Sequence, residues 1–156
     1  MGGKINAQIS GERIILDSLD REFVLLHSRL SHLTQQMSDE TVYLTPTHSQ
    51  HSAGESILRS AAEVEQTFGG ITANLWDDPF EWTLPEHLST TTKIIEHLGE
   101  VEALRQRAFS SFADDSCLPK QVATPSGTRP LIDLLLGTLL RAREHQAAAI
   151  VTFKSR

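Results

Sequence analysis

An apolar repeat near the start of this sequence constrains its fold more than any other feature. Large apolar residues recur there at alternating steps of three and four, at Leu16, Leu19, Phe23, Leu26, Leu30, Leu33 and Met37. This spacing follows the 3.6-residue turn of an α-helix, so it predicts one long helix over 10–37 with a single apolar face. Ser10 is the expected N-cap of that helix.

Three later segments repeat this spacing and predict further helices over 52–75, 90–113 and 130–153. The first of these opens with Ser52-Ala53-Gly54-Glu55, the pattern of a capping box. No β segment is evident. We therefore expect an all-α fold, a single domain over 1–156 built as an up-and-down or crossover four-helix bundle. The residues expected to be largely buried are Leu26, Leu30, Ile57, Phe68, Leu98, Val101, Leu135 and His145.

Two of the connections between these helices contain two prolines each, which helix interiors do not tolerate. The segment 76–89 also carries Trp76, Phe80 and Trp82. We interpret it as an aromatic loop that closes one end of the bundle, and a lid over a ligand is the alternative. The segment 114–127 is interpreted as an irregular connection.

Charge and cysteine content exclude several classes of function. The chain has 156 residues, and 14 Lys+Arg stand against 20 Asp+Glu, a net charge of −6. Binding to nucleic acid or to an anionic membrane rests on a cationic surface, so neither partner is expected. The most apolar stretch, 131–140, is far shorter than the roughly 20 residues of a membrane span. A single cysteine, Cys117, allows no internal disulfide and fits a reducing cytoplasm, so we expect a soluble cytoplasmic protein.

Common catalytic motifs are absent from the sequence. There is no glycine-rich phosphate loop, no GxSxG and no HExxH, and none of the seven histidines forms an HxxxH or ExxH pair. His48 and His51 are interpreted as solvated turn residues, with a metal site as the alternative. Cys117 is interpreted as a plain thiol. No catalytic residue and no cofactor can be assigned.

The order of several short motifs is similar to that of a known family. The motifs are Gly54-Glu55, Ile57 to Glu65, Asp115-Ser116-Cys117-Leu118, Pro125 to Leu131, and Leu139 to Gln146. In this order and spacing, over residues 10 to 154, the chain resembles the DinB/YfiT-like superfamily of bacterial four-helix bundles. The resemblance implies that fold. It also implies a homodimer that forms through helix faces.

Active members of that superfamily hold zinc or nickel with three histidines, and some are thiol S-transferases. By the resemblance, Arg141 and His145 occupy the positions of the histidine pair on the fourth helix. The third position falls on Arg59 or on Ser60, depending on which neighbouring motif anchors the comparison. Because arginine keeps its proton and repels a divalent ion, the resemblance implies a degenerate site without a metal.

The charged residues near these positions have two interpretations. In the simple one, Arg59 forms a helical ion-pair ladder with Glu55 and Glu63, and His145 is a hydrogen-bonded core histidine. In the other, charged side chains face inward and fill the position of the former metal site, and His145 is the one remaining ligand of that site. The candidate members of that cluster are Arg59, Arg141, Glu63, Glu96, Glu144 and His97. We expect Arg141 to bind a carboxylate, most directly that of Glu63.

The function expected on these grounds is a DinB-like bundle without the three-histidine metal site, acting as a small-molecule binding or protein interaction module. The alternative is a metal-dependent enzyme, similar to a thiol S-transferase or hydrolase, that uses unconventional ligands. A DNA-binding role in a damage response is suggested only by the family's name, and the net charge of −6 argues against it.

Overall fold

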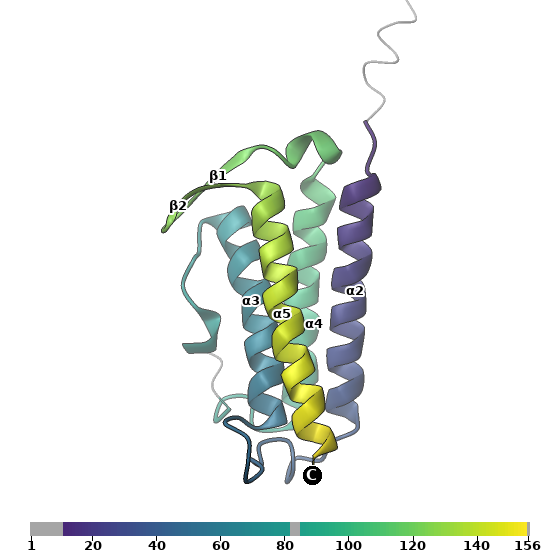
Figure 1. The fold of residues 1–156 in the computed structure, drawn as a ribbon, viewed down its shortest axis with the longest axis vertical. Helices are drawn as coiled ribbons and strands as arrows, with labels where there is room; N and C mark the ends of the chain where they lie inside the picture. The colour runs from purple at the N-terminus through teal and green to yellow at the C-terminus, as the bar shows by residue number, and fades with distance from the viewer. Residues whose placement is uncertain (1–10, 82–84, 156) are drawn as a thin grey trace, which may run out of the picture.

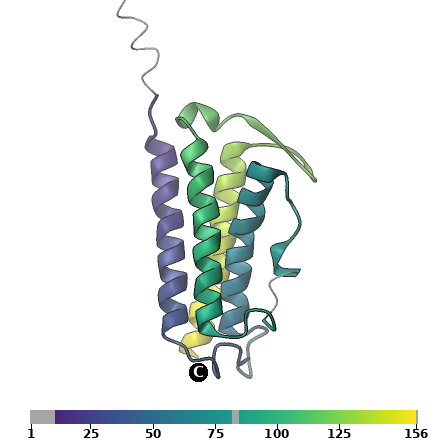
Figure 2. The ribbon, with the colours of Figure 1, turned by 180° about the vertical axis from the view of Figure 1, so that it is seen from behind.

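The computed structural model describes residues 11–81 and 85–155, which form four long helices lying side by side (Figure 1; Figure 2 shows the other side). The helices are α2 (Ile14–Gln35), α3 (Ala53–Ala73), α4 (Thr91–Ser111) and α5 (Leu131–Lys154). Each lies within a few residues of a predicted helix. Ser10, the predicted N-cap, lies outside the described residues, and α2 begins at Ile14 with Arg13 at its N-cap position.

The order of the helices in space follows from a long connection. In Figure 1, α2 and α5 run downward, whereas α3 and α4 both run upward, so the chain between α3 and α4 travels back along the helices. This arrangement is the crossover scheme of the two that the sequence left open. α3 packs most extensively against α5, and α4 packs against both α2 and α3. The faces of α3 and α5 that meet are therefore the central seam of the molecule.

Apolar side chains fill the space between the helices. Three phenylalanines from different helices meet at its centre: the ring of Phe23 lies 5.4 Å from that of Phe68 and 5.7 Å from that of Phe109. Seven of the residues predicted to be buried are in this core, namely Leu26, Leu30, Ile57, Phe68, Leu98, Val101 and Leu135. The capping box at the start of α3 is also confirmed, with Ser52 and Glu55 bonding each other's backbone N–H groups.

The prediction that the chain has no sheet is wrong in one place. Residues 121–130 form an antiparallel hairpin of β1 (Gln121–Thr124) and β2 (Gly127–Pro130), preceded by the short 3-10 turn η2 (Asp115–Cys117). Pro125 lies in the two-residue turn, and Gly127 adopts a φ of 121°, which favours glycine. The prolines therefore mark the turn and the end of a strand, not an irregular connection. The hairpin is a small addition outside the helical core.

The aromatic connection was predicted to close one end of the molecule, and this is also wrong. It descends along the outside of α3 and includes the 3-10 turn η1 (Pro79–Glu81) (Figure 1). Its upper part is held by Gln66, whose side-chain amide donates to the carbonyl of Trp76 at 2.7 Å. Near its lower end, the Tyr43 hydroxyl donates to the carbonyl of Leu88 at 2.5 Å. Trp82 lies outside the described residues.

None of the helices in the described part of the chain combines the length and the hydropathy that a membrane span requires.

Candidate functional site

Two of the positions at which the resemblance expects metal ligands, Arg141 and His145, lie at the seam between α3 and α5. Nε of Arg141 donates to Oε1 of Glu63 at 2.8 Å, and Nε2 of His145 lies 3.7 Å from Oε2 of the same carboxylate. Arg141 and His145 are one helical turn apart on α5, so a single carboxylate from α3 reaches both. The expected pairing of Arg141 with Glu63 is confirmed.

This cluster lies at the edge of the seam and not in the core. The exposed fractions of the side chains are 54% for Arg141, 34% for His145 and 23% for Glu63. The prediction that His145 is largely buried is therefore wrong. The buried stripe of α5 passes through Ala142 and Gln146 instead, and His145 lies on its flank. Because the Glu63–Arg141 pair is partly solvated, it contributes at most about 1 kcal/mol to folding stability.

The two candidates for the third ligand position are Ser60 and Arg59, and they make different contacts. Ser60 is buried, and its hydroxyl donates to the carbonyl of Ala142 at 2.7 Å, which allows α3 and α5 to approach closely. The guanidinium of Arg59 lies over the ring of Phe80, 4.1 Å from its centroid. The helical ladder with Glu55 and Glu63 is thus not formed. Glu55 belongs to the capping box, and Glu63 turns toward α5.

The remaining candidates lie away from this cluster. His97 was expected to join it, but its Nε2 lies 3.5 Å from Oε1 of Glu65, between α3 and α4. Burial lowers the pKa of His97, while burial and the nearby Glu100 raise the pKa of Glu65. The side chains of Glu96 and Glu144 are exposed, and within the described residues no ion pair joins either of them to Arg141.

The residues at the positions where the resemblance expects metal ligands do not fit a transition metal. A guanidinium cannot coordinate a cation, the Ser60 hydroxyl is committed to a backbone carbonyl, and the Glu63 carboxylate is shared between Arg141 and His145. In the described part of the chain, no three His, Cys, Asp or Glu side chains gather as a ligand set, and this includes the segment with His48 and His51.

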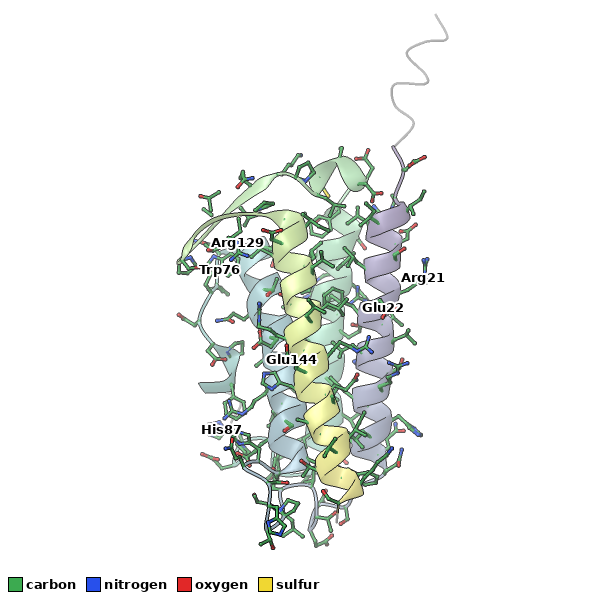
Figure 3. All side chains as sticks on the ribbon, in the orientation of Figure 1. Arg21, Glu22, Trp76, His87, Arg129 and Glu144 are labelled. Atoms are coloured by element: carbon green, nitrogen blue, oxygen red, sulfur yellow. The ribbon has the colours of Figure 1, made fainter. Side chains whose placement is uncertain are left out.

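A groove of about 360 Å³ adjoins this cluster, with Arg141 as a shared wall. It is lined by residues of α3 and α5, by the hairpin turn and by Trp76, and Figure 3 labels two of the lining residues, Trp76 and Arg129. Two guanidinium groups, those of Arg129 and Arg141, line the groove together with one carboxylate, that of Asp133. The hydroxyls of Thr124 and Ser126 add hydrogen-bonding groups at the rim.

Two glycines shape this groove. A Cβ at position 70 would lie 2.3 Å from the indole ring of Trp76, so Gly70 lets that ring lie flat against α3. A Cβ at position 137 would lie 3.0 Å from an Nη atom of Arg141, so Gly137 leaves room for the guanidinium beside the helix. The resulting wall combines a flat aromatic ring with cationic donors. Such a surface suits a small organic anion that has a planar part.

The most deeply buried charge was not singled out from the sequence. Arg105 on α4 is 1% exposed, and its guanidinium binds Glu102 at 2.8 and 2.9 Å and Asp20 of α2 at 2.5 Å. Burial alone would lower the pKa of Arg105, but hydrogen bonds to the two carboxylates more than offset this and raise it. The adjoining cavity of about 20 Å³ holds no more than a water molecule, so the cluster is structural. The Glu102-x-x-Arg105 spacing on an apolar face was the available signal.

Cys117 lies in η2 and is partly buried. Burial raises the pKa of its thiol, so little thiolate is present near neutral pH. This agrees with its interpretation as a plain thiol.

Comparisons with known proteins identify the fold. No protein-family model matches this chain, and no curated protein matches it. Its structure is similar to the crystal structure of a conserved protein from Enterococcus faecalis, with a TM-score of 0.70 over 92% of this chain and 97% of that chain. The two sequences are 14% identical over the match, so the similarity shows a shared helical fold and nothing about activity.

Proposed function

We propose that this chain is a DinB-like four-helix bundle in which an ion-pair cluster replaces the metal site, and that it binds a small organic anion in the adjoining groove. The observation that carries this proposal is the position of Glu63, whose carboxylate bridges Arg141 and His145. In the proposed relationship, these two residues stand where active members of the superfamily have a histidine pair.

Electrostatics supports a function without metal chemistry. The electrostatic repulsion between a guanidinium and a divalent ion about 4 Å away costs several kcal/mol, even at an effective dielectric constant of about 20. The same fixed charge favours an anionic ligand, and Arg129, whose guanidinium also lies 3.8 Å from the Asp133 carboxylate, supplies a second guanidinium to the lining of the groove. The ring of Trp76 offers a surface on which a planar ligand can stack.

Elemental analysis of the purified protein tests the loss of the metal site. We expect no stoichiometric zinc or nickel. Near-stoichiometric metal that disappears in a His145→Ala variant would contradict the proposal and favour the alternative, a metal-dependent transferase or hydrolase.

Ligand binding is tested by NMR titration with benzoate, phenyl phosphate and the uncharged analogue benzamide. We expect the two anions to shift the indole N–H resonance of Trp76 and benzamide to leave it unchanged. An Arg129→Gln variant should weaken binding about tenfold, the loss of one charge-assisted hydrogen bond. Arg107→Gln, on the exposed face of α4, is the matched control. Equal affinity in both variants would contradict the assignment of the groove.

A further inference from the structure

A second groove lies between α2 and α5, at the lower ends of these helices in Figure 1. Its volume is about 400 Å³, which is within the range of small-molecule sites. One wall is the face of α2 from Ser28 to Gln36, and the other is the end of α5 from Ile150 to Lys154. It shares no lining residue with the groove that adjoins Arg141.

Side-chain contacts close the upper part of the seam between α2 and α5. The amide of Gln146 donates to the carbonyl of Leu26 at 3.1 Å, and Arg143 donates to the carboxylate of Glu22 at 3.1 Å. These contacts hold the upper halves of the two helices together. The groove begins below them, so it is closed at one end of the seam.

The floor of this groove is apolar. Leu33 is buried, and Ile150 and Phe153 are partly buried against the core. From Ser28 to Gln36 the wall on α2 is about 12 Å long, at the rise of an α-helix. An extended alkyl chain of medium length therefore fits along the floor.

The charged side chains that line the groove are basic. Arg29 and Lys154 provide two positive charges, His32 adds an imidazole, and no Asp or Glu of the described residues lines the groove. This is a local exception in a chain whose net charge is −6. An alkyl chain with a negatively charged end is complementary to both the floor and the charge.

The ends of the two helices account for only part of this basic lining. A helix C-terminus carries a partial negative charge, which favours the basic residues in the last turns, His32 of α2 and Lys154 of α5. Arg29 lies before the last turn of α2, so this effect does not explain it. Five other arginines pair with a carboxylate, whereas Arg29 has no such partner among the described residues.

We propose that this groove binds a medium-chain fatty acid as its carboxylate. The guanidinium of Arg29 donates to both carboxylate oxygens, and Lys154 adds a second positive charge. The alkyl chain packs on Leu33, Ile150 and Phe153. Because the two grooves share no residue, this site stands or falls independently of the proposed function.

The experiment is isothermal titration of the full chain with hexanoate, octanoate and decanoate below the concentrations at which they form micelles. We expect saturable binding that tightens up to about tenfold for each two added carbons, because each methylene buries further apolar surface. Acetate, which lacks the chain, should give no saturable heat. 1-Octanol, which lacks the charge, should bind at least about tenfold more weakly than octanoate.

Variants of the basic residues locate the site. Arg29→Gln should weaken octanoate binding about tenfold, and Lys154→Gln by a smaller factor. Arg21→Gln is the matched control, because Arg21 lies on the same helix outside the groove and donates to the Ser18 hydroxyl at 3.1 Å. This variant should bind octanoate as the unaltered chain does. Circular dichroism and the melting temperature establish that each variant is folded.

No saturable binding of octanoate, or equal affinity in folded Arg29→Gln and Arg21→Gln, would overturn the proposal. If octanoate shifted the indole N–H resonance of Trp76 and left the ring resonances of Phe153 in place, the ligand would lie in the groove that adjoins Arg141. Binding to phosphatidylglycerol vesicles without binding of free octanoate would assign the second groove to a membrane surface. Self-association that Arg29→Gln abolishes, without octanoate binding, would assign it to a second copy of the chain.

Discussion

At the scale of single residues, the strongest constraint on stability is the buried cation between α2 and α4. Arg105 satisfies its donors with Glu102 and Asp20, and the rings of Phe23 and Phe109 lie 5.8 and 5.2 Å from its guanidinium carbon. Because Glu102 is itself only 11% exposed, removing the arginine would leave a carboxylate without its counter-ion. Removing one partner of a buried ion pair lowers folding stability strongly, although the intact pair stabilises the fold little more than a well-packed apolar pair would.

Arg105→Met therefore tests whether this pair is structural. We expect the free energy of unfolding to fall by about 3 kcal/mol or more, because Glu102 is left unpaired in the core. The double variant Arg105→Met/Glu102→Gln should recover part of the loss. Urea denaturation monitored by circular dichroism measures both. Arg107→Met, exposed on the same helix, is the control. A similarly small loss of unfolding free energy in both arginine variants would show that the buried ion pair does not contribute to stability.

His97 makes a pH-dependent contribution with a definite sign. Burial lowers its pKa in the folded state, so just below about pH 6.5 the unfolded chain binds a proton that the folded chain does not. Protonation of His97 thus favours unfolding, and the stability that its neutral imidazole contributes is lost as pH falls. Two carboxylates face the ring: Glu65, whose raised pKa gives a contribution of opposite sign, and Glu100.

The variant His97→Gln isolates this contribution from that of Glu65. We expect the stability of the variant relative to the unaltered chain to rise as pH is lowered from about 7 toward 5, because only the unaltered chain loses the imidazole contribution. Urea unfolding at a series of pH values provides the measurement. A stability difference that does not change with pH would contradict the assignment.

The site could be predicted only where contacts depend on regular helices. The pairing of Glu63 with Arg141 followed from positions on two expected helices, and this hydrogen bond is present in the structure. The stacking of Arg59 on Phe80 depends on the path of the segment 74–81, and no local pattern in the sequence specifies that path. The partner of His97 depends in the same way on which helices are neighbours.

At the scale of secondary-structure elements, two helix glycines that look alike in the sequence have opposite roles. Gly70 of α3 is in contact with Trp76, and an added Cβ would lie 2.3 Å from the ring. Gly99 of α4 has no neighbouring atom within 4 Å of such a Cβ. Alanine favours a helix over glycine by about 1 kcal/mol, so only the surroundings distinguish the two sites.

The pair Gly70→Ala and Gly99→Ala tests this contrast. We expect Gly99→Ala to stabilise the chain by up to about 1 kcal/mol. Gly70→Ala should destabilise it by about 1–3 kcal/mol, because the indole has to move. It should also shift the indole N–H resonance of Trp76, which donates to Asn74 at 2.9 Å. Thermal unfolding and NMR provide the two measurements. If Gly70→Ala were stabilising and left the resonance in place, the close packing of Trp76 would be wrong.

The elements that were predicted well are those with long amphipathic repeats. All four helices were found near their expected positions, since a stripe of many apolar residues outweighs local exceptions such as Gly69-Gly70. The hairpin was missed because β1 and β2 have four residues each, too few for a clear alternation of apolar and polar residues. Its turn, Pro125-Ser126 followed by Gly127 at positive φ, was the one local signal.

At the scale of the whole molecule, the outer face of α5 is uncovered. Figures 1 and 3 show α5 at the front of the four helices, with Glu144 about midway along it. Leu136, Leu140 and Val151 are 43%, 63% and 67% exposed. With Ala147, they lie within about 60° of arc on the helix, which makes a continuous apolar stripe. Contiguous exposed apolar surface of this kind marks an interaction site.

Charge at the edges of this stripe favours a second copy as its partner. Arg143, whose guanidinium also donates to Glu22 of α2 at 3.1 Å, and Glu144 lie on opposite edges of it, at its midpoint. A two-fold axis parallel to α5 would therefore bring Arg143 of one copy beside the partner's Glu144, and the reverse contact would form by symmetry. We propose a homodimer that forms through this stripe. A single helix pair buries less than the roughly 1,600 Å² of a standard interface, so the dimer should dissociate reversibly.

Leu140→Glu tests this assembly. We expect the unaltered chain to sediment as a dimer over a micromolar concentration series, and Leu140→Glu to sediment as a monomer, because a carboxylate would be buried unpaired between the helices. Its helical content and melting temperature should be preserved, since the side chain is 63% exposed. The matched control is Leu44→Glu, which alters an exposed leucine outside α5, in the connection before α3. A 17.3 kDa particle for the unaltered chain throughout the series would contradict the dimer, and monomerisation by Leu44→Glu alone would place the interface elsewhere.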